Sequence, residues 1–528
     1  MIILCYITKM DSVFGLSKSP PNFNHVAKNQ HNERIPPNRT VADSAFPNGV
    51  IEIPFGQSRP FIPSKCNIAH ALDLTKANGN SLEVADGIAY ANDPVACLYT
   101  KMEVTLNGSV VSSNDVYHPQ IEACNMRSSR SGAWLDSVGE SLHEMKPDLD
   151  ARIADVSSDG VDNNNSSVKT YAELGMAGTV TLAYVYTTGV VTLSGTGDVN
   201  GEIQVGDIIS FIGHGGYRIS SPVLIRTSNT SFTIYPSLDD GTLTATAMTT
   251  CLLRRTRNDA ALRAGKRVFP YQPSSLAFFK HDGVMPPGNW SLRLYPAAAS
   301  VYKKHAVESY TAKTPGTDYE LAVKSIFFMQ HSVDVPDIED GTYYNVLEEI
   351  SAYTDTLPAG TSLNTTKFNV PPSTYGLTVA FQGQDAGSAT NSSLTRFRVG
   401  ATDNDQYLSQ FWIDYASQSV PPYHAQPERG SNSQKAQEMY VDSMTNNGLL
   451  NRVGGCEDLV EYQKRGSYYR YNFLKAKGDQ STVANVYSQF SSAVSNLRML
   501  LFAHHRNTVV LQVKHGRVES ANVVPLLD

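Results

Sequence analysis

The clearest pattern in this chain is an alternation of apolar and polar residues over positions 101–106, which read KMEVTL. Met102, Val104 and Leu106 share one side of an extended chain, because successive side chains of a strand point to opposite faces. The next two residues, Asn107-Gly108, tolerate positive φ and close tight hairpins, and another extended run follows them. The pattern therefore predicts a β-hairpin with one buried face.

Short alternating runs of this kind continue along most of the chain from position 50 onward. Between residues 170 and 250 they follow one another roughly every 8–15 residues, with turn residues between them, which is typical of a small β-barrel or sandwich. Because insertions are tolerated in surface loops, we interpret 170–250 as a β-rich unit inserted into a larger β-domain.

Helical spacing appears at three places. Residues 434–444 and 483–490 carry apolar side chains three and four positions apart, which predicts amphipathic helices, and residues 121–126 fit one or two helical turns. After these helices the chain predicts two terminal strands, 497–503 and 509–513, with Asn507 between them.

Proline-rich and acidic segments suggest how the chain is divided. Residues 1–49 are mostly polar and turn-rich, so we expect a flexible N-terminal arm that either stays disordered or becomes ordered on assembly. A proline and several acids after residue 334 separate two apolar runs, which predicts a first β-domain over 50–335 and a second over 336–528. Met10 is a plausible start of the mature protein, since the apolar run of residues 1–9 is too short for a signal sequence. No stretch reaches the roughly 20 apolar residues that a membrane span needs.

Composition agrees with a globular protein rich in strands. Of the 528 residues, 41% are hydrophobic and 18% are charged, which is enough apolar material for large cores. The formal net charge of −7 gives the chain as a whole no attraction for nucleic acid. The only dense basic run is Arg254–Arg267, which predicts a solvated surface helix around 258–263. The alternative is contact with an acidic partner or with nucleic acid, since phosphate contact needs only Lys and Arg.

Potential metal ligands do not form a recognised pattern. Asp159, Asp162 and Asn164 offer oxygen donors, but their loop lacks the EF-hand spacing and its closing glutamate. The cysteines show no CxxC or Cys/His spacing, which argues against structural zinc and predicts buried, reduced thiols. They are Cys5, Cys66, Cys97, Cys124, Cys251 and Cys456.

A catalytic site is not indicated either. The motifs G-x-S-x-G, H-E-x-x-H and Walker A are absent, and His214 lies in a Gly-rich run that we interpret as a turn. The run 504–506, His-His-Arg, falls at a predicted turn, and we expect the carboxylates of Asp337, Glu339 and Asp340 to be solvated at the domain boundary. We therefore nominate no catalytic, cofactor-binding or metal-binding residue and expect a protein that is not an enzyme.

Two stretches resemble a known family. Residues 91–117, with the run ND…CLYTKMEVTLNGSVVS, resemble the corresponding hairpin in the first jelly roll of double jelly-roll major capsid proteins of the Polinton, adintovirus and virophage-like type. Residues 268–294 resemble the segment that leads into a late strand of the same jelly roll. The matching positions are Leu276, Phe278, Phe279, Asp282, Pro287, Gly288 and Leu292–Leu294. The family's basic residues are absent between Tyr117 and Glu122.

The resemblance implies an all-β fold of two tandem jelly-roll β-sandwiches, a double jelly roll. The small β-barrel-like insertion that we expect in the first jelly roll lies outside the resemblance, and a few short helices complete the expected fold. It also implies a major capsid protein of the virion, made and assembled inside the host cell. Homotrimers of such a protein form pseudo-hexagonal, hexon-like capsomers that tile an icosahedral shell. The partners would be further copies of the chain, neighbouring capsomers, and penton and minor capsid proteins.

The residues themselves leave two other functions open. One is a β-rich virion fibre or glycan-binding structural protein, with 170–250 as the part that binds sugar. The other is a carbohydrate-active enzyme on a jelly-roll scaffold, because a fold does not fix a function.

Overall fold

We describe the fold from a computed structural model of the chain. The residues described are 29–82, 88–91, 93–114, 116–130, 134, 139, 168–170, 181–194, 205, 208–212, 218–228, 230–236, 242–247, 252–254, 265–309, 313–335, 338–358, 362–384, 394, 397, 408–425, 433–446, 468–475, 479–490 and 497–526.

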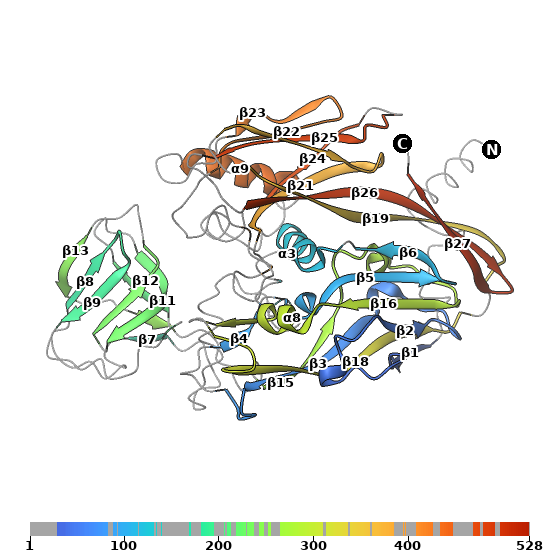
Figure 1. Ribbon diagram of the computed structural model, residues 1–528, viewed down its shortest axis with the longest axis horizontal. Helices are drawn as coiled ribbons and strands as arrows, with labels where there is room; N and C mark the ends of the chain where they lie inside the picture. The colour runs from blue at the N-terminus through green and yellow to red at the C-terminus, as the bar shows by residue number, and fades with distance from the viewer. Residues whose placement is uncertain are drawn as a thin grey trace.

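Eight strands form a first β-sandwich (Figure 1). They are β1 (Gln30–Ile35), β2 (Ile51–Phe55), β3 (Asn67–Lys76), β5 (Tyr99–Leu106), β6 (Ser109–Ser113), β15 (Gly265–Tyr271), β16 (Trp290–Pro296) and β18 (Tyr319–Val333). One sheet has the order β1-β18-β3-β15 and the other β2-β16-β5-β6. Counted along the chain, these orders are 1-8-3-6 and 2-7-4-5, which is the strand order of a jelly roll.

The second half of the chain repeats this arrangement. Its strands are β19 (Gly341–Thr356), β20 (Asn364–Asn369), β21 (Thr374–Gly383), β22 (Leu408–Tyr415), β23 (Gln418–Ala425), β24 (Tyr468–Asn472), β25 (Val483–Phe490) and β26 (Leu497–Lys514). The sheet orders β19-β26-β21-β24 and β20-β25-β22-β23 are again 1-8-3-6 and 2-7-4-5. A ninth strand, β27 (Arg517–Pro525), pairs with β26. The expected all-β fold of two tandem jelly rolls is therefore confirmed by strand order.

Short elements complete the two sandwiches. Strands β4 (Ile88–Tyr90) and β17 (Val307–Ser309) form a two-stranded sheet. The described helices of more than one turn are α3 (His118–Ser129), α8 (Ala299–His305) and α9 (Ser433–Asn446). The helical spacings at 121–126 and 434–444 predicted α3 and α9 correctly.

The predicted hairpin is β5 and β6, closed by Asn107 at φ 50° and Gly108 at φ 83°. Met102, Val104 and Leu106 are buried as expected. The opposite face of β5 is covered too, because Glu103 is 6% and Thr105 1% exposed. Part of this cover is α3, which lies against β5.

The two sandwiches share buried apolar residues. The core of the first includes Leu347 of β19, Val509 and Leu511 of β26, and Val518 of β27. Conversely, Ile121 and Cys124 of α3 belong to the core of the second. Side chains of each half therefore complete the interior of the other.

The insertion forms a sheet of its own, in a separate lobe in Figure 1. Its strands are β7 (Val168–Thr170), β8 (Thr181–Val185), β9 (Val190–Ser194), β10 (Ile208–Ile212), β11 (Arg218–Ser228), β12 (Ser231–Ile234), β13 (Leu243–Ala247) and β14 (Leu252–Arg254). The order is β13-β8-β9-β12-β11-β10-β14-β7. Tyr184 and Phe211 meet edge to face in its interior, with ring centroids 5.3 Å apart. The lobe thus has apolar packing of its own.

The helix predicted at 483–490 is wrong, because this segment is strand β25. Its buried residues alternate, with Ala484, Val486 and Phe490 facing the core. The same apolar positions fit a helical period, but β25 lies between β20 and β22 and hydrogen bonds to both. Pairing with these two neighbouring strands therefore makes residues 483–490 a strand rather than a helix.

The turn predicted at Asn507 is also wrong. Strand β26 runs without a break from Leu497 to Lys514, and the turn comes after it, at His515 and Gly516 with φ 52° and 68°. The polar run at 504–506 stays in the strand because β19 pairs with β26 along its whole length, from Gly341 opposite Val513 to Thr356 opposite Arg498.

The predicted N-terminal arm, residues 1–49, needs a correction from residue 29 onward. Strand β1 lies within it and forms one edge of a sheet of the first sandwich, paired with β18. This strand escaped prediction because its sequence, QHNERI, has almost no apolar residues, and none of its side chains is fully buried. The earlier part of the arm, residues 1–28, lies outside the described residues.

Three of the cysteines are described, and all three are buried free thiols: Cys66, Cys97 and Cys124. Burial raises the pKa of Cys66 to about 12 and also raises that of Cys97. Both are therefore neutral thiols at physiological pH. Cys5, Cys251 and Cys456 lie outside the described residues.

Candidate assembly site

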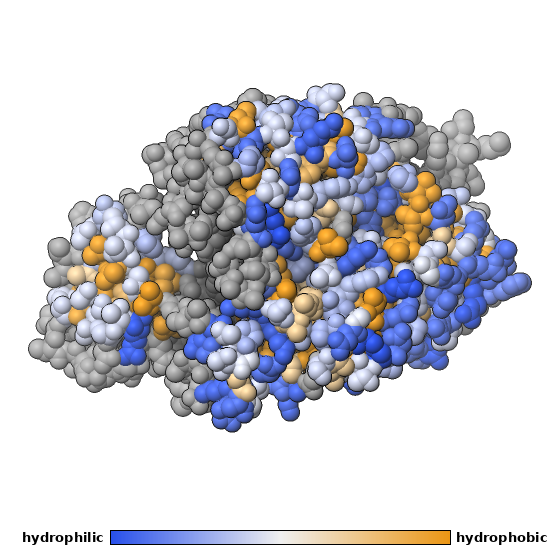
Figure 2. Space-filling view, viewed as in Figure 1, coloured by the Kyte–Doolittle hydropathy of each residue, from blue (hydrophilic) through white to orange (hydrophobic). Residues whose placement is uncertain are grey.

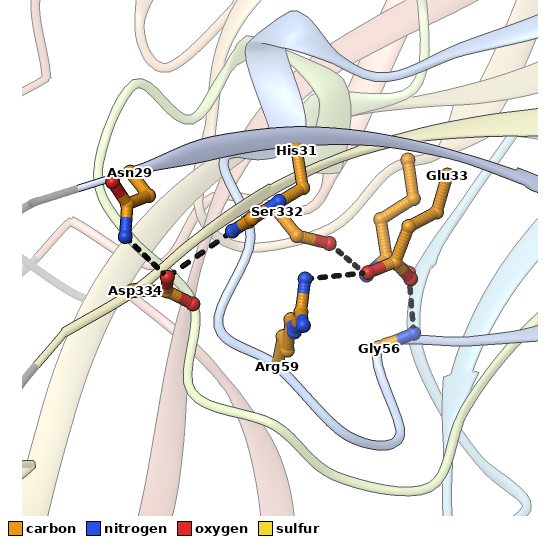
Figure 3. Close-up of polar contacts among 8 residues, drawn as sticks. Asn29, His31, Glu33, Gly56, Arg59, Ser332 and Asp334 are labelled. Atoms are coloured by element: carbon orange, nitrogen blue, oxygen red, sulfur yellow. Dashed lines mark hydrogen bonds and ion pairs between the residues drawn. The ribbon is translucent and has the colours of Figure 1, made fainter.

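The edge strand β1 is held by polar side chains as well as by its backbone pairing. Its partner β18 is about three hundred residues away in the chain, and the two run antiparallel from Gln30 opposite Val333 to Ile35 opposite Phe328. We call the polar group on this strand the N-terminal latch. It consists of Asn29, His31, Glu33, Arg59 and Asp334 (Figure 3).

Asp334 is the acceptor at one end of the N-terminal latch. Its Oδ2 accepts hydrogen bonds from Asn29 Nδ2 at 3.0 Å and from His31 Nε2 at 3.1 Å. At the other end, Arg59 Nη1 lies 3.6 Å from Glu33 Oε1. Figure 3 shows these contacts side by side along β1. The hydrogen bonds to Asp334 and the ion pair between Arg59 and Glu33 therefore hold two ends of a strand that has little apolar surface to bury.

The hydrogen bonds from His31 and then from Asn29 lower the pKa of Asp334. A carboxylate with a lowered pKa stabilises the folded state above its ordinary pKa, and that contribution disappears as the pH falls through the lowered value. All the ion-paired side chains are substantially exposed, and exposed pairs of this kind contribute little. Strand β1 is thus attached mainly through its backbone ladder.

A buried polar cluster lies at the junction of α3 with the chain after β15. The carboxylate of Glu122 accepts bonds from the backbone N–H groups of Ser274, at 2.9 Å, and Ser275, at 2.7 Å. It also accepts from both serine hydroxyls. Because Glu122 is fully buried, these four donors replace the water that the charge has lost. They fix α3 between the two sandwiches.

The seam between the sandwiches contains titratable groups of both. Glu349 of β19 is 5% exposed, and its Oε2 accepts from Ser113 N of β6 at 3.4 Å. Burial raises the pKa of Glu349 to about 7. Lys280, from the first half, contributes opposite charge there. The seam therefore holds a carboxyl group, that of Glu349, whose charge depends on near-neutral pH.

Further contacts close the seam at its other end. Asn107 Nδ2 donates to the backbone oxygen of Glu519 at 2.6 Å, and Val518 N donates to Pro287 O at 2.8 Å. The hairpin turn of β5 and β6 is thus hydrogen bonded to β27 of the second half, while Asn107 and Gly108 stay exposed.

Comparison with known proteins gives likenesses in structure only. No family model matches this chain, and no curated relative matches it. The structure of the Sputnik virophage is 12% identical, with a TM-score of 0.49, over 96% of this chain and 92% of that chain. The mavirus major capsid protein is 12% identical, with a TM-score of 0.43, over 97% and 96%. The capsid of the virus PBCV-1 is 11% identical, with a TM-score of 0.40, over 94% and 98%.

All three of these solved structures are viral. Their identities and TM-scores are low, so the fold of this chain is established by its own strand order, given above.

The histidines of the 504–506 run are hydrogen bonded to hydroxyl groups inside the second sandwich. His504 Nε2 lies 2.8 Å from Thr378 Oγ1, and His505 Nε2 lies 3.0 Å from Ser351 Oγ. Both side chains are buried in β26, and burial lowers both pKa values, that of His504 well below its ordinary value. They are neutral hydrogen-bonding groups within the second sandwich.

The other sequence candidates are only partly described. In the basic run, Lys266 is exposed and the Arg267 guanidinium lies over the Phe269 ring at 4.7 Å, while residues 255–264 lie outside the described residues. Glu339 and Asp340 are described, and the Asp340 carboxylate accepts from Gly516 N at 3.2 Å. Asp337, His214 and the loop with Asp159, Asp162 and Asn164 lie outside the described residues. Among the described residues no three His, Cys, Asp or Glu side chains cluster as metal ligands, and no described helix is long and apolar enough to cross a membrane.

Sequence reasoning missed both the N-terminal latch and the seam. The partners in each are far apart in the chain: His31 and Asp334 by 303 residues, Ser113 and Glu349 by 236. The bonds from Ser274 and Ser275 to Glu122 likewise join residues 152 and 153 positions apart, so no local pattern marks them.

Proposed function

We propose that this chain is a viral major capsid protein, located in the virion, and that three copies form a pseudo-hexagonal capsomer. The observation that carries this proposal is the repetition of one strand order in the two halves. Three chains of two similar sandwiches supply six similar blocks around a threefold axis. Six such blocks fill a nearly hexagonal outline, and hexagonal units tile an icosahedral shell.

The shared core supports this role. A tile must keep its two blocks in a fixed relation while it binds its neighbours. Leu347, Val509 and Val518 of the second half lie in the core of the first, and Glu122 fixes α3 between the halves. The shared core and these bonds would therefore hold the two sandwiches in a fixed relation. In this proposal the role is structural rather than catalytic.

Contacts between capsomers would be weaker than this seam. On the face shown in Figure 2, apolar and polar side chains are interspersed over both sandwiches. The exposed large apolar residues are spread over several elements; they include Val110, Val268, Tyr344, Leu474 and Val524. Mixed surfaces of this kind suit reversible contacts with neighbouring capsomers and with penton and minor capsid proteins.

The remaining parts of the chain receive roles within the same proposal. The inserted unit, 170–250, would form a tower on the outer face of the capsomer. Residues 1–28 would reach a neighbouring subunit or the particle interior, and the basic run Arg254–Arg267 would contact an acidic partner or nucleic acid.

The test is the mass of the purified protein in solution by light scattering, with negative-stain images of the same sample. We expect a species of three times 57.6 kDa with hexagonal outlines. A monomer that never assembles would contradict the proposal. A matched variant without residues 170–250 should still form trimers, and loss of all soluble protein from that variant would contradict the assignment of the insertion as a tower.

A further inference from the structure

A polar cleft opens at one end of the second sandwich. It has a volume of about 630 Å³ and lies between the β22–β23 turn and the chain that enters β25. Asp414, Ser417 and Gln418 line it from the turn, and Gln480, Thr482 and Asn485 line it from the other side. It is separate from both the N-terminal latch and the seam.

Hydrogen bonds from side chains next to the cleft hold its backbone in place. The Tyr415 hydroxyl is hydrogen bonded to the carbonyl oxygens of Ser481, at 2.9 Å, and Thr374, at 3.3 Å. Lys475 Nζ donates to the same tyrosine hydroxyl at 3.2 Å and to Pro372 O at 2.7 Å. Asp479 Oδ1 accepts from Ser481 N at 2.8 Å. The walls are therefore preformed, which lowers the entropy cost of binding.

The turn itself is unusual. Ala416 and Ser417 both have positive φ, 50° and 59°, in a region that L residues with a side chain rarely adopt. Glycine would relieve that strain at no loss to the turn. Strained conformations of this kind gather at ligand-binding sites.

The lining chemistry narrows the class of ligand. The side chains lining the cleft are mostly amides and hydroxyls with one carboxylate, Asp414, and Asp414 lies opposite Asn485 in the β22–β25 register. The carboxylate disfavours an anion, and a single carboxylate is too little for a metal ion or for glycoside hydrolysis, which needs two. Val483, 37% exposed, adds a small apolar patch to the cleft.

We propose that this cleft binds the ring of a neutral sugar. Vicinal hydroxyls of a pyranose match the donors and acceptors of side-chain amides and a carboxylate, and the C–H face of the ring would lie on Val483. The site gives the chain a glycan-binding function, placed on the second sandwich rather than on the insertion at 170–250. It does not depend on the capsid role, because every lining residue belongs to one sandwich of one chain.

The test is saturation-transfer NMR of the full-length protein with methyl glucoside, methyl galactoside, methyl mannoside and N-acetylglucosamine, and with sialyllactose as an acidic probe. We expect transfer to at least one neutral pyranoside, with a Kd on the order of 1 mM. Asn485→Ala should weaken that binding about tenfold, the effect of one lost hydrogen bond. The control Thr365→Ala, exposed on the neighbouring strand β20 and not part of the cleft lining, should bind as the wild type does.

A second variant shows whether weaker binding could come from misfolding of Asn485→Ala instead of from the lost side chain. Ser417→Gly removes a lining hydroxyl where the backbone favours glycine, so it should fold at least as well as the wild type and bind more weakly. The proposal is overturned if no neutral pyranoside shows transfer, if sialyllactose alone does, or if Asn485→Ala and Ser417→Gly both bind like the wild type.

Discussion

The two sandwiches close the same hairpin, between their fourth and fifth strands, in different ways. In the first, Asn107 and Gly108 make the turn, and Asn107 donates to Glu519 O of the second half. In the second, Ala416 and Ser417 adopt similar φ values without a glycine and line an open cleft. One turn has glycine at its second position and is bonded to the other half of the chain, and the other has no glycine and lines a cleft.

This difference shows how one strand order can serve two purposes. Where the turn only has to close the hairpin and bond to another part of the chain, Asn-Gly supplies the positive φ values with little strain. Where the turn lines a cleft, side chains at both positions provide surface for recognition at a cost in backbone strain. The repeated topology therefore fixes the backbone and leaves the turns free to differ.

The largest expected effect tests whether the halves unfold together. Trp290 is fully buried in the first sandwich and packs against Phe55, Phe61 and Phe278. Trp290→Ala should lower the free energy of unfolding by about 3–5 kcal/mol. Because the core is shared, urea unfolding followed by circular dichroism should keep a single transition. Leu474→Ala, at an 89% exposed position, is the control and should change stability by less than about 0.5 kcal/mol. A transition of the first sandwich that shifts in the Trp290 variant while that of the second sandwich stays in place would show that the halves are independent.

The seam predicts a pH dependence. The pKa of Glu349 is raised from 4.5 to about 7 in the folded protein, so the folded state holds its proton more tightly than the unfolded state. Stability from this group is full below pH 4.5 and falls as the pH rises to about 7. At about 1.4 kcal/mol per pKa unit, the loss is up to about 3 kcal/mol. The control Glu349→Gln has no charge to bury, so the slope of unfolding free energy against pH should become flatter over this range. An equal slope in the variant would contradict the assignment.

Exchanging the two turns sharpens the comparison directly. Replacing Asn107-Gly108 by Ala-Ser should destabilise the protein by about 2 kcal/mol, because it places a side chain at positive φ and removes the bond to Glu519. Replacing Ala416-Ser417 by Asn-Gly should stabilise it by about 1 kcal/mol. Both are measured by chemical denaturation. Effects of the same sign would mean that the two turns are not equivalent in backbone strain.

The smallest effect concerns the N-terminal latch. His31→Ala removes one donor to Asp334, and amide hydrogen exchange of residues 30–35 should become faster while the second sandwich is unchanged. In the wild type, amide exchange of residues 30–35 should also become faster as the pH falls below 3.8, the ordinary pKa of Asp334. The measured rates are first corrected for the pH dependence of intrinsic exchange. The variant Asn369→Ala, in the exposed part of β20, is the control. Unchanged exchange in β1 would mean that the latch contributes nothing to its attachment.

Local alternation predicted much of the fold. The hairpin at 101–111 was visible because its apolar residues alternate and its turn is Asn-Gly. The strands 483–490 and 497–514 were misread, one as a helix and one as broken, since their outcome depends on strands β20, β22 and β19 elsewhere in the chain. When the apolar spacing of a short segment fits both a helix and a strand, the strands that pair with it determine its secondary structure.

Neither the latch nor the cleft could be predicted from the sequence. The latch residues Asn29, His31 and Glu33 are ordinary polar residues in an arm-like segment, and their partner Asp334 is 303 positions from His31 in the chain. The cleft combines residues 414–419 with residues 480–485. The turn at Ala416 and Ser417 has no glycine, so the sequence does not indicate a turn there. Sites built from side chains of distant segments leave no periodic trace in either segment.

The shared core also sets an order of events during synthesis. Val509, Leu511, Val513 and Val518 complete the interior of the first sandwich, yet they leave the ribosome after every other strand of that sandwich and after most of the second. A nascent chain therefore carries a first half with an open apolar face until these residues arrive. We therefore expect the first sandwich to reach its final packing only after the last strands of the second half have been made.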